Sequence, residues 1–212
     1  MIRNIVFDMG GVLMCFDADK ILDNNGILDP LDREIVKDKV FHSPEWREYD
    51  RGTVEKESFI RFIDELPEHL RGLFRHILLE ECFAEKQMPV YTFMEPFIGR
   101  LKKAGYKIYL LSNAGQDWYH YSKFNPCFKH FDGTFVSSDY KLLKPEPEIY
   151  EKFLDVFHLE AAECVFIDDV QANIDGAINA GMNGICYSSD RQNVSDLEKE
   201  LNKIGVNVDA EN

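Results

Sequence analysis

The sequence predicts an α/β fold: a doubly wound parallel sheet of the Rossmann type, with an α-helical segment inserted after the first strand. From about residue 91 onward, short apolar runs alternate with stretches of helical periodicity, which is typical of βαβ units. Between the first apolar run and residue 89 only helical patterns occur. Four apolar runs end in polar residues, at Asp8, at Ser112 and Asn113, at Ser137 and Ser138, and at Asp168 and Asp169. Because parallel strands share one carboxyl edge, we expect these polar groups to converge.

The first predicted strand covers residues 5–7, an uninterrupted run of β-branched and aromatic side chains that suits a buried strand. Asp8 follows it directly, at the point where open α/β sheets place their active sites. Gly10 and Gly11 come next, and glycines allow the backbone to turn sharply and to approach a ligand closely. An acid at a strand end can also be a simple turn residue, and this segment alone does not decide between the two interpretations.

Residues 17–89 are predicted to form a helical cap, inserted into a core that consists of residues 1–16 and 90–212. Asp29 before Pro30 and Ser43 before Pro44 are typical helix starts, in which a capping side chain precedes a proline in the first turn. Thr53 is expected to cap a further helix. Apolar residues at helical spacing continue to about Cys82.

The rest of the core is predicted as alternating helices and strands. The predicted helices cover residues 91–104, 147–157 and 172–180, and a capping-box sequence at residues 195–198 opens a last one. The predicted strands cover residues 107–111, 133–136, 164–167 and 184–187.

The composition excludes several classes of function. The chain has 212 residues, of which 45% are hydrophobic and 29% charged, so it can bury a sizeable core. Its formal net charge of −14 disfavours binding to nucleic acid but permits a small phosphorylated ligand at a local cationic site. The five cysteines are widely spaced, which indicates neither a disulfide framework nor a zinc site and suits the cytoplasm. No apolar run is long enough for a membrane span.

A chemically coherent set of residues lies at the predicted carboxyl edge: Asp8, Ser112, Lys144, Asp168 and Asp169. Carboxylates crowded into one crevice repel each other unless a divalent cation lies among them, and Mg²⁺ prefers oxygen ligands of this kind. Mg²⁺ in turn binds phosphoryl oxygens, and a carboxylate beside it can attack phosphorus to form an aspartyl-phosphate. Lysine and hydroxyl donors, here Lys144 and Ser112, are what the charged oxygens of a transferring phosphoryl group require.

Four segments together resemble the motifs of the haloacid dehalogenase-like (HAD) hydrolase superfamily, in the subfamily with a helical cap after the first strand. These segments are Phe7-Asp8-Met9-Gly10-Gly11-Val12-Leu13, Leu111-Ser112-Asn113, Lys144-Pro145-Glu146-Pro147 and Phe166-Ile167-Asp168-Asp169. The resemblance implies a HAD core in which Asp8 is the nucleophile and Ser112, Asn113 and Lys144 contact the substrate phosphate. It also implies that Mg²⁺ is bound by Asp8, by the backbone carbonyl of Gly10 and by Asp169, with Asp168 as a ligand or beside one.

Gly10 departs from the pattern of most phosphatases in this superfamily, which carry a second aspartate there as the general acid and base. Such help is typically worth about 10²–10⁴-fold in rate. Another group can replace it, and Asp17, where the chain passes into the cap, is one candidate. Alternatively the substrate has a good leaving group, as a sugar 1-phosphate does, or the protein is a poor catalyst.

Residues in the predicted cap point to one branch of the superfamily. Trp46, Tyr49, Asp50, Arg51 and Gly52, together with Gly10, resemble the α-D-glucose-1-phosphate phosphatases. Arg51 is therefore predicted as a substrate contact, whereas Trp46 and Tyr49 are expected to belong to the core of the cap.

The sequence thus predicts a Mg²⁺-dependent phosphomonoester hydrolase that acts on a small phosphorylated metabolite such as glucose 1-phosphate. We expect it to work in the cytoplasm as a monomer or weak homodimer, without nucleic-acid or membrane partners. Two alternatives are a metal-independent 2-haloacid dehalogenase and a regulatory protein that binds a phosphorylated ligand with little turnover.

Overall fold

The computed structural model describes residues 1–80 and 83–208, and its centre is a parallel sheet of five strands. The strands are β1 (Asn4–Phe7), β2 (Lys107–Ser112), β3 (Gly133–Val136), β4 (Cys164–Asp168) and β5 (Asn183–Cys186). Their order across the sheet is β3-β2-β1-β4-β5. The predicted α/β class and doubly wound parallel sheet are therefore confirmed.

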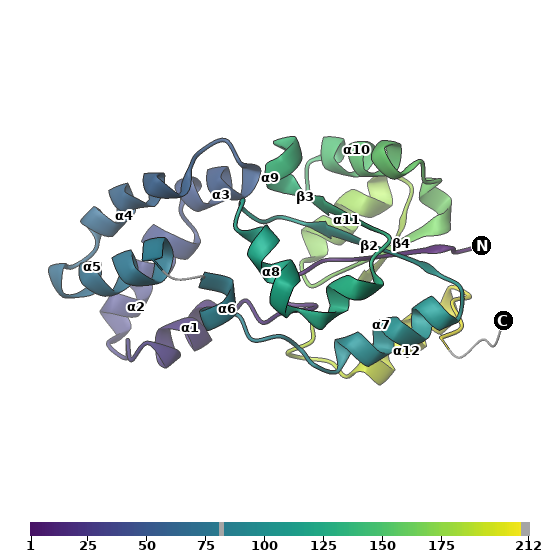
Figure 1. Ribbon diagram of the computed structural model, residues 1–212, viewed down its shortest axis with the longest axis horizontal. Coiled ribbons are helices and arrows are strands. Elements are labelled where there is room, and N and C mark those ends of the chain that lie inside the picture. Colours follow the sequence, from purple (N-terminus) through teal and green to yellow (C-terminus); the bar gives the residue numbers. More distant parts are fainter. Residues whose placement is uncertain (81–82, 209–212) are drawn as a thin grey trace.

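Side chains alternate between the two faces of the central strand, and each face has its own hydrophobic core. Ile5 and Phe7 of β1 pack in one core with the apolar faces of α7 (Met94–Lys103) and α12 (Val194–Lys203). Val6 points to the other core, which is formed with α10 (Pro147–Phe157) and α11 (Gln171–Asn179). In Figure 1 the first pair of helices lies below the sheet and the second pair above it. This burial on both faces explains why β1 is apolar throughout, as parallel strands usually are.

The chain order places the functional edge of the sheet between β1 and β4. From β1 the chain moves outward through β2 to β3, and then crosses back to β4 on the other side of β1. Ligands bind outside the carboxyl ends of the strands at such a switch point. Phe7 is paired with Ile167, and the Asp8 amide donates a hydrogen bond to the Ile167 carbonyl over 2.9 Å. Asp8 and Asp168 therefore leave the sheet side by side.

Between Ala18 and Gln87 the described residues form helices and connecting turns but no strand, and they lie beyond the carboxyl ends of the sheet strands, at the left of Figure 1. These helices are α1 (Ala18–Asn24), α2 (Pro30–Val36), α3 (Pro44–Arg51), α4 (Ile60–Glu65), α5 (Glu68–Arg75) and α6 (Phe83–Gln87). Shorter π or 3₁₀ turns cover Lys37–Phe41, Lys56–Phe59 and His76–Glu80. We propose that residues 17–89 act as a cap over a core of residues 1–16 and 90–212. Cys82 lies outside the described residues.

Helix starts were predicted with mixed success. Asp29 and Ser43 do cap α2 and α3, and each precedes a proline in the first turn. Thr53 caps no helix, because its hydroxyl bonds to Glu48 in the turn that follows α3. The capping box of α12 is formed by Asn193 and Asp196, two residues before the predicted one.

Several short helical elements were not predicted. They are α8 (Trp118–Phe124), α9 (Ser137–Tyr140) and the 3₁₀ turns Pro126–His130 and Ala161–Glu163. Each is seven residues or shorter, which leaves too few turns for a periodic apolar pattern to develop.

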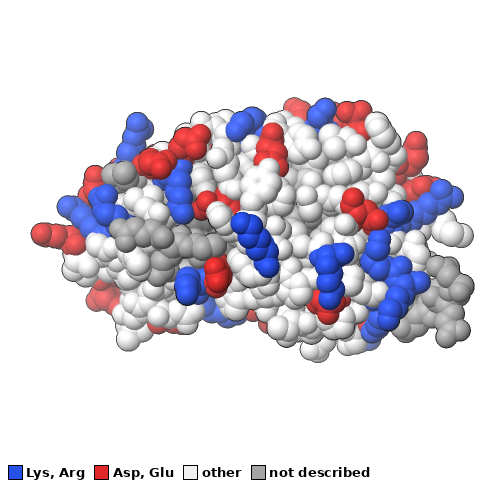
Figure 2. All heavy atoms as spheres, in the orientation of Figure 1, with Lys and Arg blue, Asp and Glu red and all other residues white. Residues whose placement is uncertain are grey.

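Charged residues occur over both halves of the face in Figure 2, with basic and acidic side chains in each half. Several basic side chains are paired with acids, as where Lys102 and Lys107 meet Asp132 at 2.8 and 3.3 Å. None of the described helices combines the length and apolar character that crossing a membrane requires. Of the cysteines in the described part of the chain, Cys15, Cys127 and Cys164 are buried free thiols and Cys186 is an exposed one.

Candidate active site

Three carboxylates meet where β1 and β4 end. Oxygens of Asp8, Asp168 and Asp169 lie within 4.8 Å of one another, in the arrangement that the sequence predicts. Asp8 and Asp168 are buried and Asp169 is partly exposed. Burial, together with the charge of Asp168, raises the pKa of Asp8 to about 7, although Lys144 opposes the shift. So many carboxyl oxygens in one place form a site with an excess of negative charge.

Lys144 is the cation of this cluster, and its side chain is almost fully buried. Its Nζ lies 2.8 Å from Asp8 Oδ1 and 2.7 Å from Asp168 Oδ2, and 5.0 Å from the centre of the Phe166 ring. Burial disfavours the charged amine, but the charges of Asp168 and Asp8 outweigh this and raise the pKa of Lys144. Lys144 is therefore held as a cation directly beside the predicted nucleophile.

The two acids at the end of β4 have different surroundings. Both oxygens of Asp168 accept hydrogen bonds, from the Val170 amide at 2.8 Å, from Asn173 at 3.1 Å and from Lys144 at 2.7 Å. Asp168 thus anchors Lys144, and its lone pairs are largely occupied. Asp169 lines the cavity described below, and burial and the charge of Asp168 raise its pKa to about 6. This geometry favours Asp169 over Asp168 as a direct metal ligand.

Gly11 makes room for the carboxylate of Asp169. Its φ is +68°, and a Cβ at this position would lie 2.3 Å from Asp169 Oδ2. At Gly10, which also lines the cavity, a Cβ would meet only Phe16 Cβ, at an ordinary 3.6 Å. The crowded carboxylates and the space that Gly11 leaves for Asp169 fit a small divalent cation with oxygen ligands, which is the chemistry of Mg²⁺.

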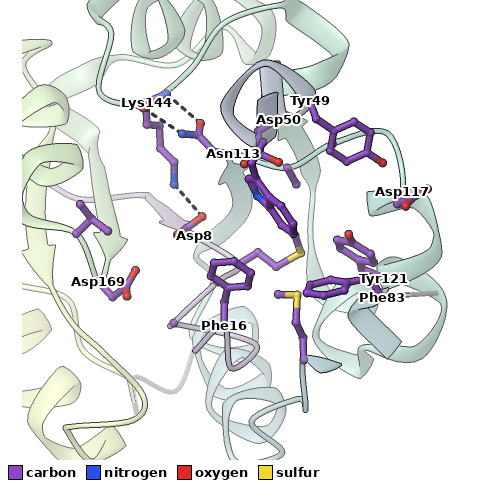
Figure 3. Close-up of a pocket in the computed structure, with 18 of the residues that line it drawn as sticks. Asp8, Phe16, Tyr49, Asp50, Phe83, Asn113, Asp117, Tyr121, Lys144 and Asp169 are labelled. Carbon is purple, nitrogen blue, oxygen red and sulfur yellow. Dashed lines mark hydrogen bonds and ion pairs between the residues drawn. The ribbon is translucent and has the colours of Figure 1, made fainter. Parts of the chain in front are cut away.

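Ser112 and Asn113, the two polar residues at the end of β2, differ in whether they reach the cavity. The Asn113 side chain accepts a hydrogen bond from the Lys144 amide at 2.9 Å and donates one to the Lys144 carbonyl at 3.0 Å (Figure 3). It thus holds the backbone of Lys144, and it also lines the cavity. Ser112 is buried at the strand end and is not among the cavity residues.

A cavity of about 270 Å³ opens beside the carboxylates, between the sheet edge and the helices of residues 18–87. Its polar end is formed by Asp8, Lys144 and Asp169. Much of the rest of its lining is apolar and largely aromatic: Phe16, Trp46, Phe59, Leu78, Phe83 and Met88. Trp46 stacks on Phe59 with ring centres 5.5 Å apart. Trp46 and Tyr49 therefore pack within an aromatic cluster, as expected, and also face the cavity.

Asp50, near the end of α3, is a further carboxyl in this cavity and lies on the side toward Asn113 and Tyr49 (Figure 3). The Gly115 backbone and the Trp46 side chain hydrogen bond to it. Burial and the nearby charge of Asp8 raise its pKa to about 7 despite these bonds and the charge of Lys144. Gly115 also admits α3, because a Cβ there would lie 2.0 Å from the Tyr49 ring.

Arg51 and Asp17 are not where the sequence analysis expected them. The Arg51 guanidinium forms two hydrogen bonds with Glu146, at 2.6 and 2.8 Å, and is not among the cavity residues. Asp17 caps α1 by accepting bonds from the amides of Asp19 and Lys20, and it too lies outside the cavity lining. The structure therefore offers no support for Arg51 as a substrate contact or for Asp17 as the missing acid.

Sequence reasoning missed much of the cavity wall. Asp117, which pairs with Lys56 over 2.9 Å, and Gly115 follow β2 in a loop without a pattern of its own. Asp50 belongs to the segment that resembles the glucose-1-phosphate phosphatases, but it stands among charged residues of a helix and was not predicted to face inward. The aromatic residues were visible as core candidates, but the cavity that they line was not.

The sequence matches the haloacid dehalogenase-like hydrolase family over residues 2–181. Three curated relatives are each 28% identical to it. The alignment with flavin mononucleotide hydrolase 1 of Arabidopsis thaliana covers 79% of this chain and 64% of that protein, so this chain spans less than two thirds of that relative's length. D-ribitol-5-phosphate phosphatase of Bacteroides thetaiotaomicron aligns over 82% of this chain and 86% of its own length. Sesquiterpene phosphatase astK of Aspergillus oryzae aligns over 85% of this chain and 87% of its own length.

A solved structure of similar fold is the HAD family enzyme bt-2542 of Bacteroides thetaiotaomicron, in complex with magnesium and inorganic phosphate. It superposes with a TM-score of 0.70 at 20% identity, covering 93% of this chain and 99% of that one. At this identity the likeness establishes a common fold.

Proposed function

The chain belongs to the haloacid dehalogenase-like hydrolases, and on that premise we propose that it is a Mg²⁺-dependent phosphatase that hydrolyses phosphomonoesters through an aspartyl-phosphate on Asp8. The observation that carries the proposal is the cluster of Asp8, Asp169 and Lys144 in the lining of one cavity, at the switch point of the sheet. The relatives named as phosphatases or as a flavin mononucleotide hydrolase support the same reaction class.

Asp8 and Asp169, with the backbone carbonyl of Gly10, would hold the metal ion, and Asp168 would stabilise the site by fixing Lys144. When bound, Mg²⁺ offsets the charge of the phosphoryl oxygens and of the carboxylates around it. Magnesium and phosphate in the similar bt-2542 enzyme support this assignment.

In the proposed reaction Asp8 attacks phosphorus while Lys144, 2.8 Å away, stabilises negative charge on the phosphoryl oxygens. Lys144 needs no reorganisation during the reaction, because Asp168 and Asn113 already hold its side chain and its backbone. A positioned cation in a buried site stabilises charge more strongly than one in water. Ser112, which is buried at the end of β2 and outside the cavity lining, is proposed on its sequence motif alone as a further donor to the phosphate.

The cavity supports a small organic phosphate as the substrate, with the phosphate at the carboxylates and the organic group against the apolar part of the lining. That part includes six apolar side chains, four of them aromatic, which suits an aromatic or aliphatic group. Relatives that act on a flavin mononucleotide and on a sesquiterpene phosphate agree with an apolar group. A sugar phosphate such as glucose 1-phosphate is the second candidate, supported by the ribitol-5-phosphate phosphatase and by the hydrogen-bonding groups Asp50, Asn113 and Asp117 in the same cavity.

The proposal is tested by phosphate release from a panel of esters with Mg²⁺ or with EDTA. The panel contains flavin mononucleotide, an isoprenoid monophosphate, ribitol 5-phosphate, glucose 1-phosphate and glucose 6-phosphate. We expect release that requires Mg²⁺ and favours the esters with apolar groups. Release of chloride from 2-chloropropionate in EDTA, without phosphatase activity, would instead identify a dehalogenase. Binding of Mg²⁺ and phosphate without any turnover would identify a regulatory module.

A further inference from the structure

Cleavage of an alkyl phosphate leaves an alkoxide that needs a proton, and Gly10 has no side chain to supply one. Apart from the clustered aspartates, the described cavity residues that carry a titratable proton are Tyr49, Asp50, Lys56, Asp117, Tyr121 and Lys144. Lys144 is bound between Asp8 and Asp168, and Asp117 is held in an ion pair by Lys56 at 2.9 Å. Tyr49 is buried and hydrogen-bonded to Asp117, and its pKa is raised by burial. Among these groups Asp50 is the carboxyl that is neither a predicted metal ligand nor part of an ion pair.

Asp50 is held firmly on the cap side of the cavity. Its backbone carbonyl accepts a hydrogen bond from Ser137 Oγ at 2.5 Å, which ties the end of α3 to α9 of the core. The Gly115 backbone and the Trp46 side chain orient its carboxyl group. The Asp50 carboxyl group lines the same cavity as Asp8 and Lys144 but forms no hydrogen bond or ion pair with either of them, so it is apart from the proposed nucleophile (Figure 3).

We propose that Asp50 is the general acid and base of this phosphatase, reaching the leaving oxygen from the cap in place of a side chain at position 10. This rests on the proposed function. In the first step the Asp8 oxygen bonds to phosphorus, the bond from phosphorus to the ester oxygen breaks, and the Asp50 carboxyl gives its proton to that oxygen. The products are an alcohol, the aspartyl-phosphate and an Asp50 carboxylate.

In the second step the Asp50 carboxylate takes a proton from a water molecule whose oxygen bonds to phosphorus. The bond between phosphorus and the Asp8 oxygen breaks, inorganic phosphate leaves, and Asp8 and Asp50 return to their starting forms. Because burial raises the pKa of Asp50 to about 7, both of its forms are accessible near neutral pH, which a group that alternates between acid and base requires.

The test compares two aromatic esters of similar size in wild type and in Asp50→Asn. The leaving group of 4-nitrophenyl phosphate needs no proton, whereas that of benzyl phosphate does. We expect Asp50→Asn to lower kcat for benzyl phosphate by about 10²–10⁴-fold and for 4-nitrophenyl phosphate by less than about tenfold. Because both rates come from one protein sample, a general loss of folded protein would lower them equally.

A second variant restores an acid from the other side of the cavity. Gly10 lines the cavity, and a Cβ there would meet only Phe16, at 3.6 Å, so Gly10→Asp can be accommodated. Gly10→Asp in the Asp50→Asn background is expected to recover turnover of benzyl phosphate by at least about tenfold. Equal losses on the two esters, or a double variant no faster than Asp50→Asn on benzyl phosphate, would overturn the role of Asp50. Wild-type protein inactive on both esters with Mg²⁺ would overturn the proposed function as well.

Discussion

At the scale of single residues, the site depends as much on glycines as on acids. Gly11 has a left-handed φ of +68°, and its missing side chain leaves the space that the Asp169 carboxylate occupies. Gly115 in the same way admits the Tyr49 ring and with it α3. The acids bring charge to the site, but Gly11 decides how closely the Asp169 carboxylate can approach, and Gly115 decides how closely α3 can pack.

Gly11→Ala is expected to weaken Mg²⁺ binding by at least about tenfold. The added Cβ would lie only 2.3 Å from Asp169 Oδ2 and would therefore displace that carboxylate. Titration calorimetry with MgCl₂ measures this directly. Gly26→Ala is the matched control, since Gly26 has a φ of +72° with no atom within 4 Å of the added Cβ. Both variants should lose about 1–2 kcal/mol of stability through backbone strain. Unchanged Mg²⁺ affinity in Gly11→Ala would contradict the role given to Asp169.

Three of the four motifs were predictable as parts of a site because they stand at the ends of strands, whereas Lys144 lies between two helices and was placed by its resemblance to a known motif. Asp8, Asp168 and Asp169 follow apolar runs, and the parallel sheet brings them together by register alone. Asp50 was not predictable as a cavity residue, because its position depends on how α3 packs on the core through Gly115 and Ser137. Contacts between segments so far apart in the chain leave no local pattern in the sequence.

At the scale of elements, α3 is the part of the cap that is most directly joined to the core. Arg51 and Arg47 both pair with Glu146, at 2.6 and 3.2 Å, and Lys141 donates to the Gly52 carbonyl. These contacts lie just before α10 and around α9, close to Lys144. Their arrangement indicates that α3 holds Asp50 and Trp46 in place over the catalytic cluster.

Arg51→Met and Glu146→Gln should each lower the free energy of unfolding by about 1 kcal/mol, since the two side chains form a bidentate, partly buried pair. The double variant should lose less stability than the sum of the two single losses, because the Arg51–Glu146 pair is shared, whereas the pairs of Glu146 with Arg47 and of Arg51 with Glu48 are not. Chemical denaturation measures all three. If Arg51 contacted the substrate, Arg51→Met would raise KM and Glu146→Gln would leave KM unchanged. That result would support Arg51 as a substrate-binding residue.

At the scale of the whole molecule, core helices cover the two faces of the sheet but not its carboxyl edge. The inserted helices lie over that edge instead (Figure 1). The alternation of strands and helices in the sequence predicted this architecture, including the helical insertion. It could not predict the cavity, whose walls come from both parts of the chain. The fold brings Asp8, the proposed nucleophile, together with the fixed cation Lys144 and several apolar side chains in the lining of one cavity, which suits the proposed hydrolysis of an organic phosphate.

The most direct test of the central claim is to trap the covalent intermediate. Wild-type protein is quenched in acid during turnover with Mg²⁺, digested, and mapped by mass spectrometry. We expect a phosphoryl group on the peptide that contains Asp8, and neither the adduct nor phosphate release in a folded Asp8→Asn protein. Turnover at the wild-type rate by Asp8→Asn, or an adduct on another residue, would contradict the assignment of Asp8 as the nucleophile.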